Sequence, residues 1–152
     1  MKEKVYLAGP LFTKYEIEAR KIEHKKFKKE FPEIETFAPI DAPFNEANPT
    51  NIEIFETDKK EMDESNIFIF DLNNMDEGTL VEVGIAIEKH KINPLVEIYG
   101  FLWDLRMGRR DGETAFDKPY GVNGFLIGGI QKHGKLVHTF DEVLELMKNK
   151  RK

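Results

Sequence analysis

The sequence lacks several features that would assign a function directly. None of its 152 residues is cysteine, which excludes disulfide scaffolds, thiolate metal sites and cysteine nucleophiles. No apolar run approaches the roughly 20 residues needed to span a bilayer, and Met1–Val5 leads directly into a strand-like run. We therefore expect no signal peptide, no membrane partner and a cytoplasmic location.

Basic residues are also fewer than acidic ones. Lys and Arg number 23 against 28 Asp and Glu, which gives a net charge of −5. Binding to nucleic acids or to a membrane surface needs a basic face, so this balance argues against both kinds of partner. With 40% hydrophobic and 34% charged residues, the composition is that of a globular protein, and the length predicts one domain over residues 1–152.

The usual phosphate and metal motifs are missing as well. Gly9-Pro10 is followed by no glycine-rich turn, and no loop has the Ser and Thr content of a flavin-phosphate site. Asp71 ends a strand-like run, but a phospho-acceptor receiver domain also needs acidic residues where this chain has Gly9-Pro10. The four histidines lack metal-ligand spacing, and His24 and His90 are predicted to lie on solvated, lysine-rich helix faces. We expect no metal and no cofactor, which leaves carboxylate chemistry.

Strand-like and helix-like runs alternate along the chain. Strands are predicted at Val5–Ala8, Thr36–Ala38, Ile67–Phe70, Pro94–Ile98 and Lys135–Thr139. Helices are predicted at about Tyr15–Phe31 (with Ile17, Ile22 and Phe27 among its apolar positions), Ile52–Glu64, Thr79–His90 and from Phe140, with a further segment near Asn123–Ile130. This alternation predicts a doubly wound parallel α/β sheet, a flavodoxin-like or Rossmann-like three-layer sandwich.

Ligands of such sheets bind beyond the carboxyl ends of the strands. That rule selects the loops after Ala8, Ala38, Phe70 and Ile98. The polar stretch Asp104–Gly121 is predicted to be a mobile surface loop, and one role open to it is that of a lid over the site.

Glu82 stands out because it is the only charged residue in the run from Thr79 to Ile87. Burying a carboxylate is costly unless it has partners or a function. The spacing Thr79-x-x-Glu82 also fits a capping box, like Thr13/Glu16, Thr50/Glu53 and Thr139/Glu142, and spacing alone favours that structural role. Its place at the ligand-binding edge favours catalysis, and the positive end of the helix dipole is expected to keep Glu82 ionised.

Three further residues are weaker candidates when each is taken alone. Asp58 lies on or beside the apolar stripe of its helix, three residues after Phe55 and four before Met62. Asp76 sits in a turn-forming segment, where acidic residues are common. Tyr6 lies within the first strand, where most tyrosines are core residues with a bonded hydroxyl.

Taken together, these positions resemble the nucleoside 2-deoxyribosyltransferase family. The similarity covers the chain from Tyr6 to about Gly129 and rests on the order and spacing of several short segments. They are Tyr6-Leu7-Ala8-Gly9-Pro10-Leu11-Phe12, Phe37-Ala38-Pro39-Ile40-Asp41, Asp58 eight residues before Asn66, Asp76 through Ala86, and Asn123-Gly124-Phe125. The resemblance implies base exchange on 2′-deoxyribonucleosides through a covalent deoxyribosyl–enzyme intermediate, with nucleosides and free nucleobases as the small-molecule partners.

The resemblance also implies roles for individual residues. Glu82 corresponds to the nucleophile, Tyr6 to the tyrosine that holds it, Asp76 to the aspartate that handles the base's proton, and Asp58 to another active-site aspartate. The implied substrate-binding residues are Gly9, Pro10, Phe12, Asp41, Asn123 and Phe125. Asn123 is expected to reach the sugar from a neighbouring subunit, which implies a homo-oligomer, a dimer or higher, with shared active sites. The chain departs from the family in its C-terminus, which lacks the tyrosine that known members place near the nucleophile.

Carboxyl groups alone can carry out this chemistry. Breaking an N-glycosidic bond develops positive charge at the anomeric carbon and negative charge on the base, so a carboxylate below the sugar and an acid beside the base suffice. Two other readings stay open: a deoxynucleoside 5′-monophosphate N-glycosidase, and a non-catalytic nucleoside-binding module. The glycosidase needs clustered phosphate donors, and residues 9–14 offer only Thr13 and Lys14.

Overall fold

The computed structural model describes residues 2–42, 48–103 and 123–152, and its centre is a parallel β-sheet. The strands are β1 (Lys4–Ala8), β2 (Glu35–Phe37), β3 (Ile67–Asp71), β4 (Glu97–Phe101) and β5 (Lys135–Val137), arranged in the order β2-β1-β3-β4-β5. The helices are α1 (Lys14–Glu30), α2 (Asn51–Glu64), α3 (Glu77–Ile92), α4 (Gly124–His133) and α5 (Phe140–Arg151), with a 3₁₀ turn η1 (Pro39–Asp41) after β2. This is the predicted doubly wound three-layer α/β fold.

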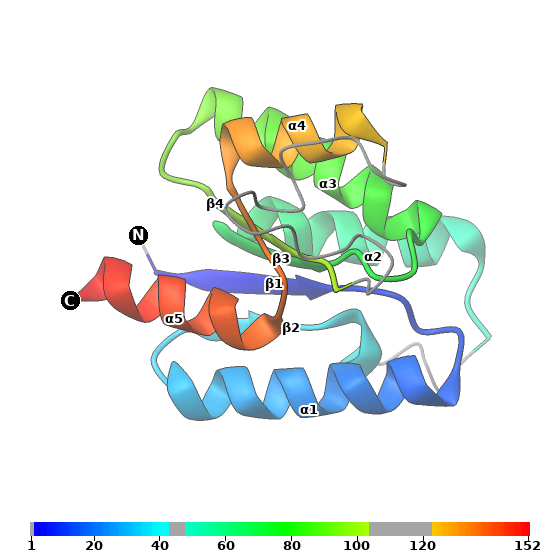
Figure 1. The fold of residues 1–152 in the computed structure, drawn as a ribbon. Helices are drawn as coiled ribbons and strands as arrows, with labels where there is room; N and C mark the ends of the chain where they lie inside the picture. The colour runs from blue at the N-terminus through cyan, green and yellow to red at the C-terminus, as the bar shows by residue number, and fades with distance from the viewer. Residues whose placement is uncertain (1, 43–47, 104–122) are drawn as a thin grey trace.

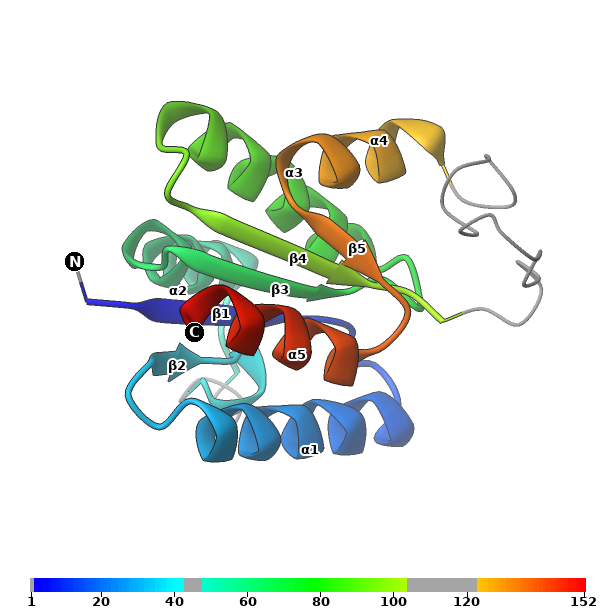
Figure 2. The same ribbon diagram turned by 60° about the vertical axis from the view of Figure 1, so that its left-hand side comes forward.

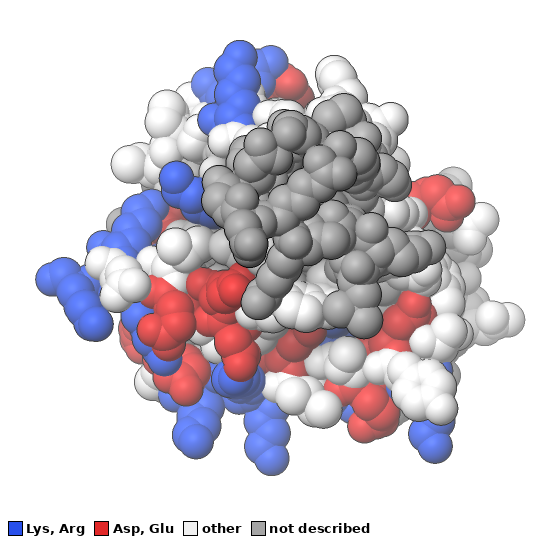
Figure 3. Space-filling view, viewed as in Figure 1, with Lys and Arg blue, Asp and Glu red and all other residues white. Residues whose placement is uncertain are grey.

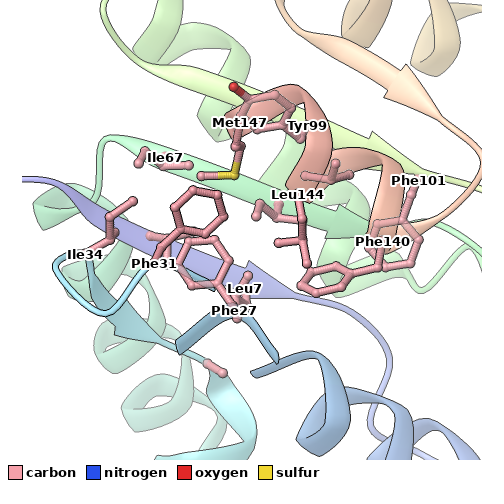
Figure 4. Close-up of a cluster of buried hydrophobic side chains, with 14 residues drawn as sticks. Leu7, Phe27, Phe31, Ile34, Ile67, Tyr99, Phe101, Phe140, Leu144 and Met147 are labelled. Carbon is pink, nitrogen blue, oxygen red and sulfur yellow. The ribbon is translucent and has the colours of Figure 1, made fainter. Parts of the chain in front are cut away.

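The helices form two layers, one on each face of the sheet. Helices α1 and α5 cover one face, and α2, α3 and α4 cover the other (Figures 1 and 2). Successive residues of β1 and β3 alternate between the two cores, as strand geometry requires. Leu7 packs toward α1 and α5 (Figure 4), and Tyr6 packs toward α2 and α3.

The strand order reverses between β1 and β3, and this switch point is where a ligand site is expected. Both neighbouring strands end at the same edge of the sheet, because every pairing in it is parallel. The loops that follow β1 and β3 therefore open side by side there, which is where ligands of this fold class bind.

The fourth strand differs from the sequence prediction at both of its ends. The fourth strand begins at Glu97, not Pro94, because Asn93 ends α3 and its side chain accepts a hydrogen bond from Leu95 N at 3.1 Å, which forms a turn. The strand then continues to Phe101, so the loop at the ligand-binding edge follows Phe101 and the prediction of Ile98 is wrong. Residues 104–122, which include the predicted surface loop, lie outside the described residues.

The buried face of α1 also differs from expectation. Ile22 is 64% exposed, whereas the buried residues of this helix are Arg20, His24 and Phe27. The prediction of a solvated His24 is therefore wrong: its Nδ1 contacts Asp41 Oδ2, and burial lowers its pKa. His90 is half-buried too, with its Nδ1 2.8 Å from Val96 O.

Charges on the surface are mixed in sign. Figure 3 shows basic and acidic side chains interspersed on the face drawn, next to the C-terminal helix. Within the described ranges, no helix is long and apolar enough to cross a membrane.

Candidate active site

The centre of the site is a hydrogen bond between a strand and a helix. Tyr6 OH, from β1, donates to Glu82 Oε1, from α3, at 2.6 Å. The tyrosine is 0% exposed, and its ring stacks on Phe37 with ring centroids 5.5 Å apart. Because the strand and the stacked ring fix this hydroxyl, it holds the Glu82 carboxylate in one place.

Glu82 has no capping role, contrary to what its spacing suggested. Helix α3 begins at Glu77, and its N-cap is Asp76, whose Oδ2 accepts hydrogen bonds from Thr79 N and Thr79 Oγ1, each at 2.7 Å. Thr79 thus lies inside the helix, and the expected Thr79/Glu82 capping box is wrong. The other three boxes are present, at the starts of α1, α2 and α5. Asp76 caps the helix earlier, which leaves Glu82 in the second turn, free to face Tyr6.

Burial raises the pKa of Glu82 to about 7. The hydrogen bond from Tyr6 lowers it, and the negative charges of Asp58 and Asp76 add to the rise. Burial therefore outweighs the helix dipole that was expected to keep Glu82 ionised, because the dipole effect fades after the first turn. Burial also raises the pKa of the Tyr6 hydroxyl, so this side chain stays a hydrogen-bond donor.

Asp58 lies on α2 and is close enough for its charge to affect both Tyr6 and Glu82. Its Oδ1 is buried without a hydrogen-bond partner among the described residues. Burial raises the pKa of this carboxyl to about 6, and the charge of Glu61 adds to the rise. The apolar stripe that Asp58 was expected to share is incomplete, since Met62 is buried but Phe55 is 59% exposed.

The structure thus brings together the four residues predicted to be catalytic, Tyr6, Asp58, Asp76 and Glu82. A carboxylate fixed by a tyrosine can act as a nucleophile, and a carboxyl group with a pKa of about 6 can hold a proton beside it. Within the described parts of the chain, no group of three or more acidic or histidine side chains could hold a metal ion.

Of the six residues predicted to bind substrate, Gly9, Pro10 and Phe12 follow β1 at the ligand-binding edge. Gly9 has a structural reason to be glycine, because a Cβ there would lie 2.2 Å from Arg20 Nη1. Pro10 is buried, and Phe12 is 74% exposed. No described contact joins Asp41 to the four residues predicted to be catalytic. Asp41 pairs instead with His24 on α1.

The remaining two, Asn123 and Phe125, lie at the start of α4. Asn123 Oδ1 accepts hydrogen bonds from Phe125 N at 2.9 Å and Leu126 N at 3.3 Å, which makes it the helix cap. Phe125 is 93% exposed, so its side chain is not part of either core formed by the described residues.

Sequence reasoning missed a buried ion pair behind the site. Arg20 Nη2, from α1, lies 2.5 Å from Asp71 Oδ2 at the end of β3 and 2.7 Å from Glu23 Oε1. The helical spacing of Arg20, His24 and Phe27 was the available signal, since residues four and seven apart share one helix face. Lys89 was missed too: its Nζ, from α3, donates to the carbonyls of Met62, Asp63 and Ser65 at the end of α2, each at 2.6 Å.

Comparison with known proteins adds a family to this geometry. Residues 5–147 match the family model described as nucleoside 2-deoxyribosyltransferase. An uncharacterized protein of Ureaplasma parvum serovar 3 is 36% identical over 94% of this chain and 92% of its own length.

Two solved structures share the fold. A conserved protein from Enterococcus faecalis V583 superimposes with a TM-score of 0.81 at 21% identity, covering 99% of both chains. The 2-desoxiribosyltransferase from Leishmania mexicana gives a TM-score of 0.53 at 18% identity, covering 86% of this chain and 98% of its own. At such low identity, these two similarities establish the fold alone.

Proposed function

Because the chain belongs to the nucleoside 2-deoxyribosyltransferase family, we propose that it exchanges the nucleobase of 2′-deoxyribonucleosides by double displacement, with Glu82 as the nucleophile. The observation that carries this proposal is the buried hydrogen bond from Tyr6 OH to Glu82 Oε1 at 2.6 Å. A glutamate that caps no helix and forms no ion pair among the described residues, yet is held by a buried tyrosine, is poorly explained by a structural role.

The reaction has two half-reactions at the anomeric carbon. In the first, the Glu82 carboxylate attacks C1′, the C1′–N bond breaks, and its electron pair leaves with the base, which takes a proton from an acidic side chain. In the second, a different base attacks C1′, the C1′–O bond breaks, and the carboxylate is restored while the incoming base returns the proton. Two inversions leave the configuration retained, as in retaining glycosidases.

Two acids are available for the proton. Asp58 can hold it, because burial raises the pKa of this carboxyl to about 6. Asp76 Oδ2 caps α3, and no hydrogen bond among the described residues uses its Oδ1, which suits Asp76 to orienting the base. No cofactor or metal is needed for either half-reaction.

Nucleosides fit the described part of the site better than nucleotides do. Asp58, Asp76 and Glu82 place three acidic groups together, and no described ion pair brings a lysine or arginine to them. A 5′-phosphate would add negative charge to this cluster, which disfavours the deoxynucleoside 5′-monophosphate N-glycosidase.

The active unit in this proposal is a homo-oligomer, a dimer or higher, that shares its sites. Phe125, which is 93% exposed, is then available to contact the site of another subunit, and it lies beside Asn123, whose Oδ1 caps α4. Mixing two inactive variants, Glu82→Gln and Asn123→Ala, tests this sharing: subunit exchange should restore part of the activity, whereas unshared sites would leave the mixture inactive.

The central experiment combines an exchange assay with a trap. Incubation of deoxyinosine with adenine should yield deoxyadenosine, and a 2′-fluorinated deoxynucleoside should leave a sugar adduct on the Glu82-containing peptide in mass spectrometry. Release of free sugar alone indicates a hydrolase, and binding without turnover across a panel of deoxynucleosides indicates a non-catalytic module. An adduct on a different residue would remove Glu82 from its role.

A further inference from the structure

We propose that Arg20 is a positioning residue for the active site: through Asp71 and Asn73 it fixes the loop that carries Asp76. Arg20 lies on α1, across the sheet from Glu82. No described contact joins it to the four residues predicted to be catalytic. The structural part of this inference stands on its own, and its kinetic part rests on the function proposed above.

The first link is the buried ion pair between α1 and β3. The side chains of Arg20 and Asp71 are 6% and 8% exposed, and Nη2 lies 2.5 Å from Oδ2. The guanidinium reaches this position because Gly9 has no side chain, since a Cβ at Gly9 would lie 2.2 Å from Nη1 and 2.8 Å from Asp71 Cβ. The pair therefore sets the orientation of the Asp71 carboxylate at the carboxyl end of β3.

The second link runs from that carboxylate into the loop between β3 and α3. Asp71 Oδ1 accepts two hydrogen bonds from Asn73, from the backbone N at 2.8 Å and from Nδ2 at 2.6 Å. The Asn73 Oδ1 atom in turn accepts a hydrogen bond from Trp103 N, just after β4, at 2.6 Å. One carboxylate oxygen thus faces Arg20 and the other holds Asn73, so the ion pair and the loop are joined through a single side chain.

The third link is the loop itself, which has an unfavourable backbone conformation. Met75 has a φ of 49°, a left-handed conformation that a residue other than glycine adopts at a cost. Asn74 is tied to the first turn of α1, since its Nδ2 donates to Glu16 Oε1 at 2.6 Å. The strained residue directly precedes Asp76, which caps α3 and lies close enough for its charge to act on Glu82. Contacts at Asn73 and Asn74 hold the strained turn in place, and with it the position of Asp76.

The ion pair is a costly way to gain stability alone. Arg20 Nε and Nη1 are buried without a hydrogen-bond partner among the described residues. A buried pair with unsatisfied donors is often no more stable than apolar side chains of similar volume. Fixing the β3–α3 loop is a role that apolar side chains could not fill, because they would not orient the Asp71 carboxylate toward Asn73.

The test compares Arg20→Met with a matched control, Lys21→Met. Lys21 is the next residue on α1, with a side chain 57% exposed and a surface ion pair to Glu18 at 3.2 Å. In the base-exchange assay, Arg20→Met should lower kcat by about 10- to 100-fold with little change in KM, as misplacement of an active-site group does. Lys21→Met should retain wild-type kcat.

Two additional variants separate positioning from a general loss of stability. Asn73→Ala leaves the ion pair in place and removes the next link, so it should reproduce the kcat loss. In a double-mutant cycle, Arg20→Met should slow the Asp76→Asn enzyme little further, because both changes remove the same placed carboxylate. Wild-type kcat in Asn73→Ala, or losses that simply multiply in the cycle, would overturn the proposal.

Hydrogen exchange gives a readout that does not depend on the reaction. The backbone amide of Asn73 should exchange faster in Arg20→Met than in Lys21→Met, while amides in the centre of β3 stay protected. If the protein exchanges no base, this measurement still decides whether Arg20 fixes the loop. Unchanged protection at Asn73 would refute the structural inference even in a fully active enzyme.

Discussion

The substitution Glu82→Gln should abolish activity and at the same time stabilise the folded protein at alkaline pH. Burial raises the pKa of Glu82 from 4.5 to about 7, so the folded protein holds this proton more tightly than the unfolded chain does. The stability that comes from this proton is present in full below pH 4.5 and is lost as the pH rises to about 7. Glutamine has no such proton and removes this pH dependence.

The size of the effect follows from the pKa values. The difference between 4.5 and about 7, at about 1.4 kcal/mol for each pH unit, corresponds to about 3 kcal/mol. Between pH 5 and pH 8, the stability of Glu82→Gln relative to wild type should therefore increase by about 2 to 3 kcal/mol. Taking the change between two pH values cancels any constant cost of burying the amide.

Urea unfolding of both proteins at pH 5 and pH 8 measures this change directly. Glu88→Gln is the matched control, because Glu88 lies on the same helix with its side chain 66% exposed, and its relative stability should stay the same at both pH values. Base exchange by Glu82→Gln should fall by at least about 1,000-fold, as expected when a nucleophile is removed. An equal pH dependence of unfolding in wild type and Glu82→Gln would refute the burial argument, and retained base exchange would refute the catalytic one.

Three further predictions concern the groups around this carboxylate. Tyr6→Phe removes a hydrogen bond to a charged group, which should raise the pKa of Glu82 by about 1 to 2 pH units. The acidic limb of the kcat/KM profile should move to higher pH by the same amount, and activity at pH 7 should fall by about 5- to 50-fold. An acidic limb at the wild-type pH would contradict this prediction. Lys89→Met removes three hydrogen bonds to carbonyls at the end of α2 and should lower the free energy of unfolding by about 2 kcal/mol in urea titrations; unchanged stability would show that these bonds contribute nothing. Gly9→Ala forces its Cβ against Arg20 Nη1 and should lower the free energy of unfolding by about 1 to 3 kcal/mol, measured by thermal unfolding. A wild-type melting temperature would mean that the guanidinium moves aside without cost.

The alternation of apolar and polar runs was sufficient to predict the fold class. Each strand and helix has a local signal, such as the uninterrupted apolar run of β3 or the capping boxes of α1, α2 and α5. The errors in element boundaries arise where two local signals compete. At the start of α3, Asp76 and Thr79 are both good caps, and at β4 the apolar residues Leu95 and Val96 obscure the turn that follows Asn93.

The candidate site was partly accessible from sequence. Glu82 is conspicuous as a lone charge in an apolar run, and the resemblance to a family selected Tyr6, Asp58 and Asp76 with it. Spacing could not separate a capping glutamate from a nucleophile, because the same four-residue pattern serves both. The structure removes the capping role, because α3 begins at Glu77 and its N-cap is Asp76.

The sequence by itself determined which segments become strands and helices, because those preferences depend on neighbouring residues. Only the tertiary structure decided that Tyr6 and Glu82, 76 positions apart, share a hydrogen bond, and that Arg20 faces Asp71 rather than solvent. The physical reason is burial: a carboxylate or guanidinium has its ordinary properties in water, and only the packing of helices on the sheet removes that water and assigns the partners.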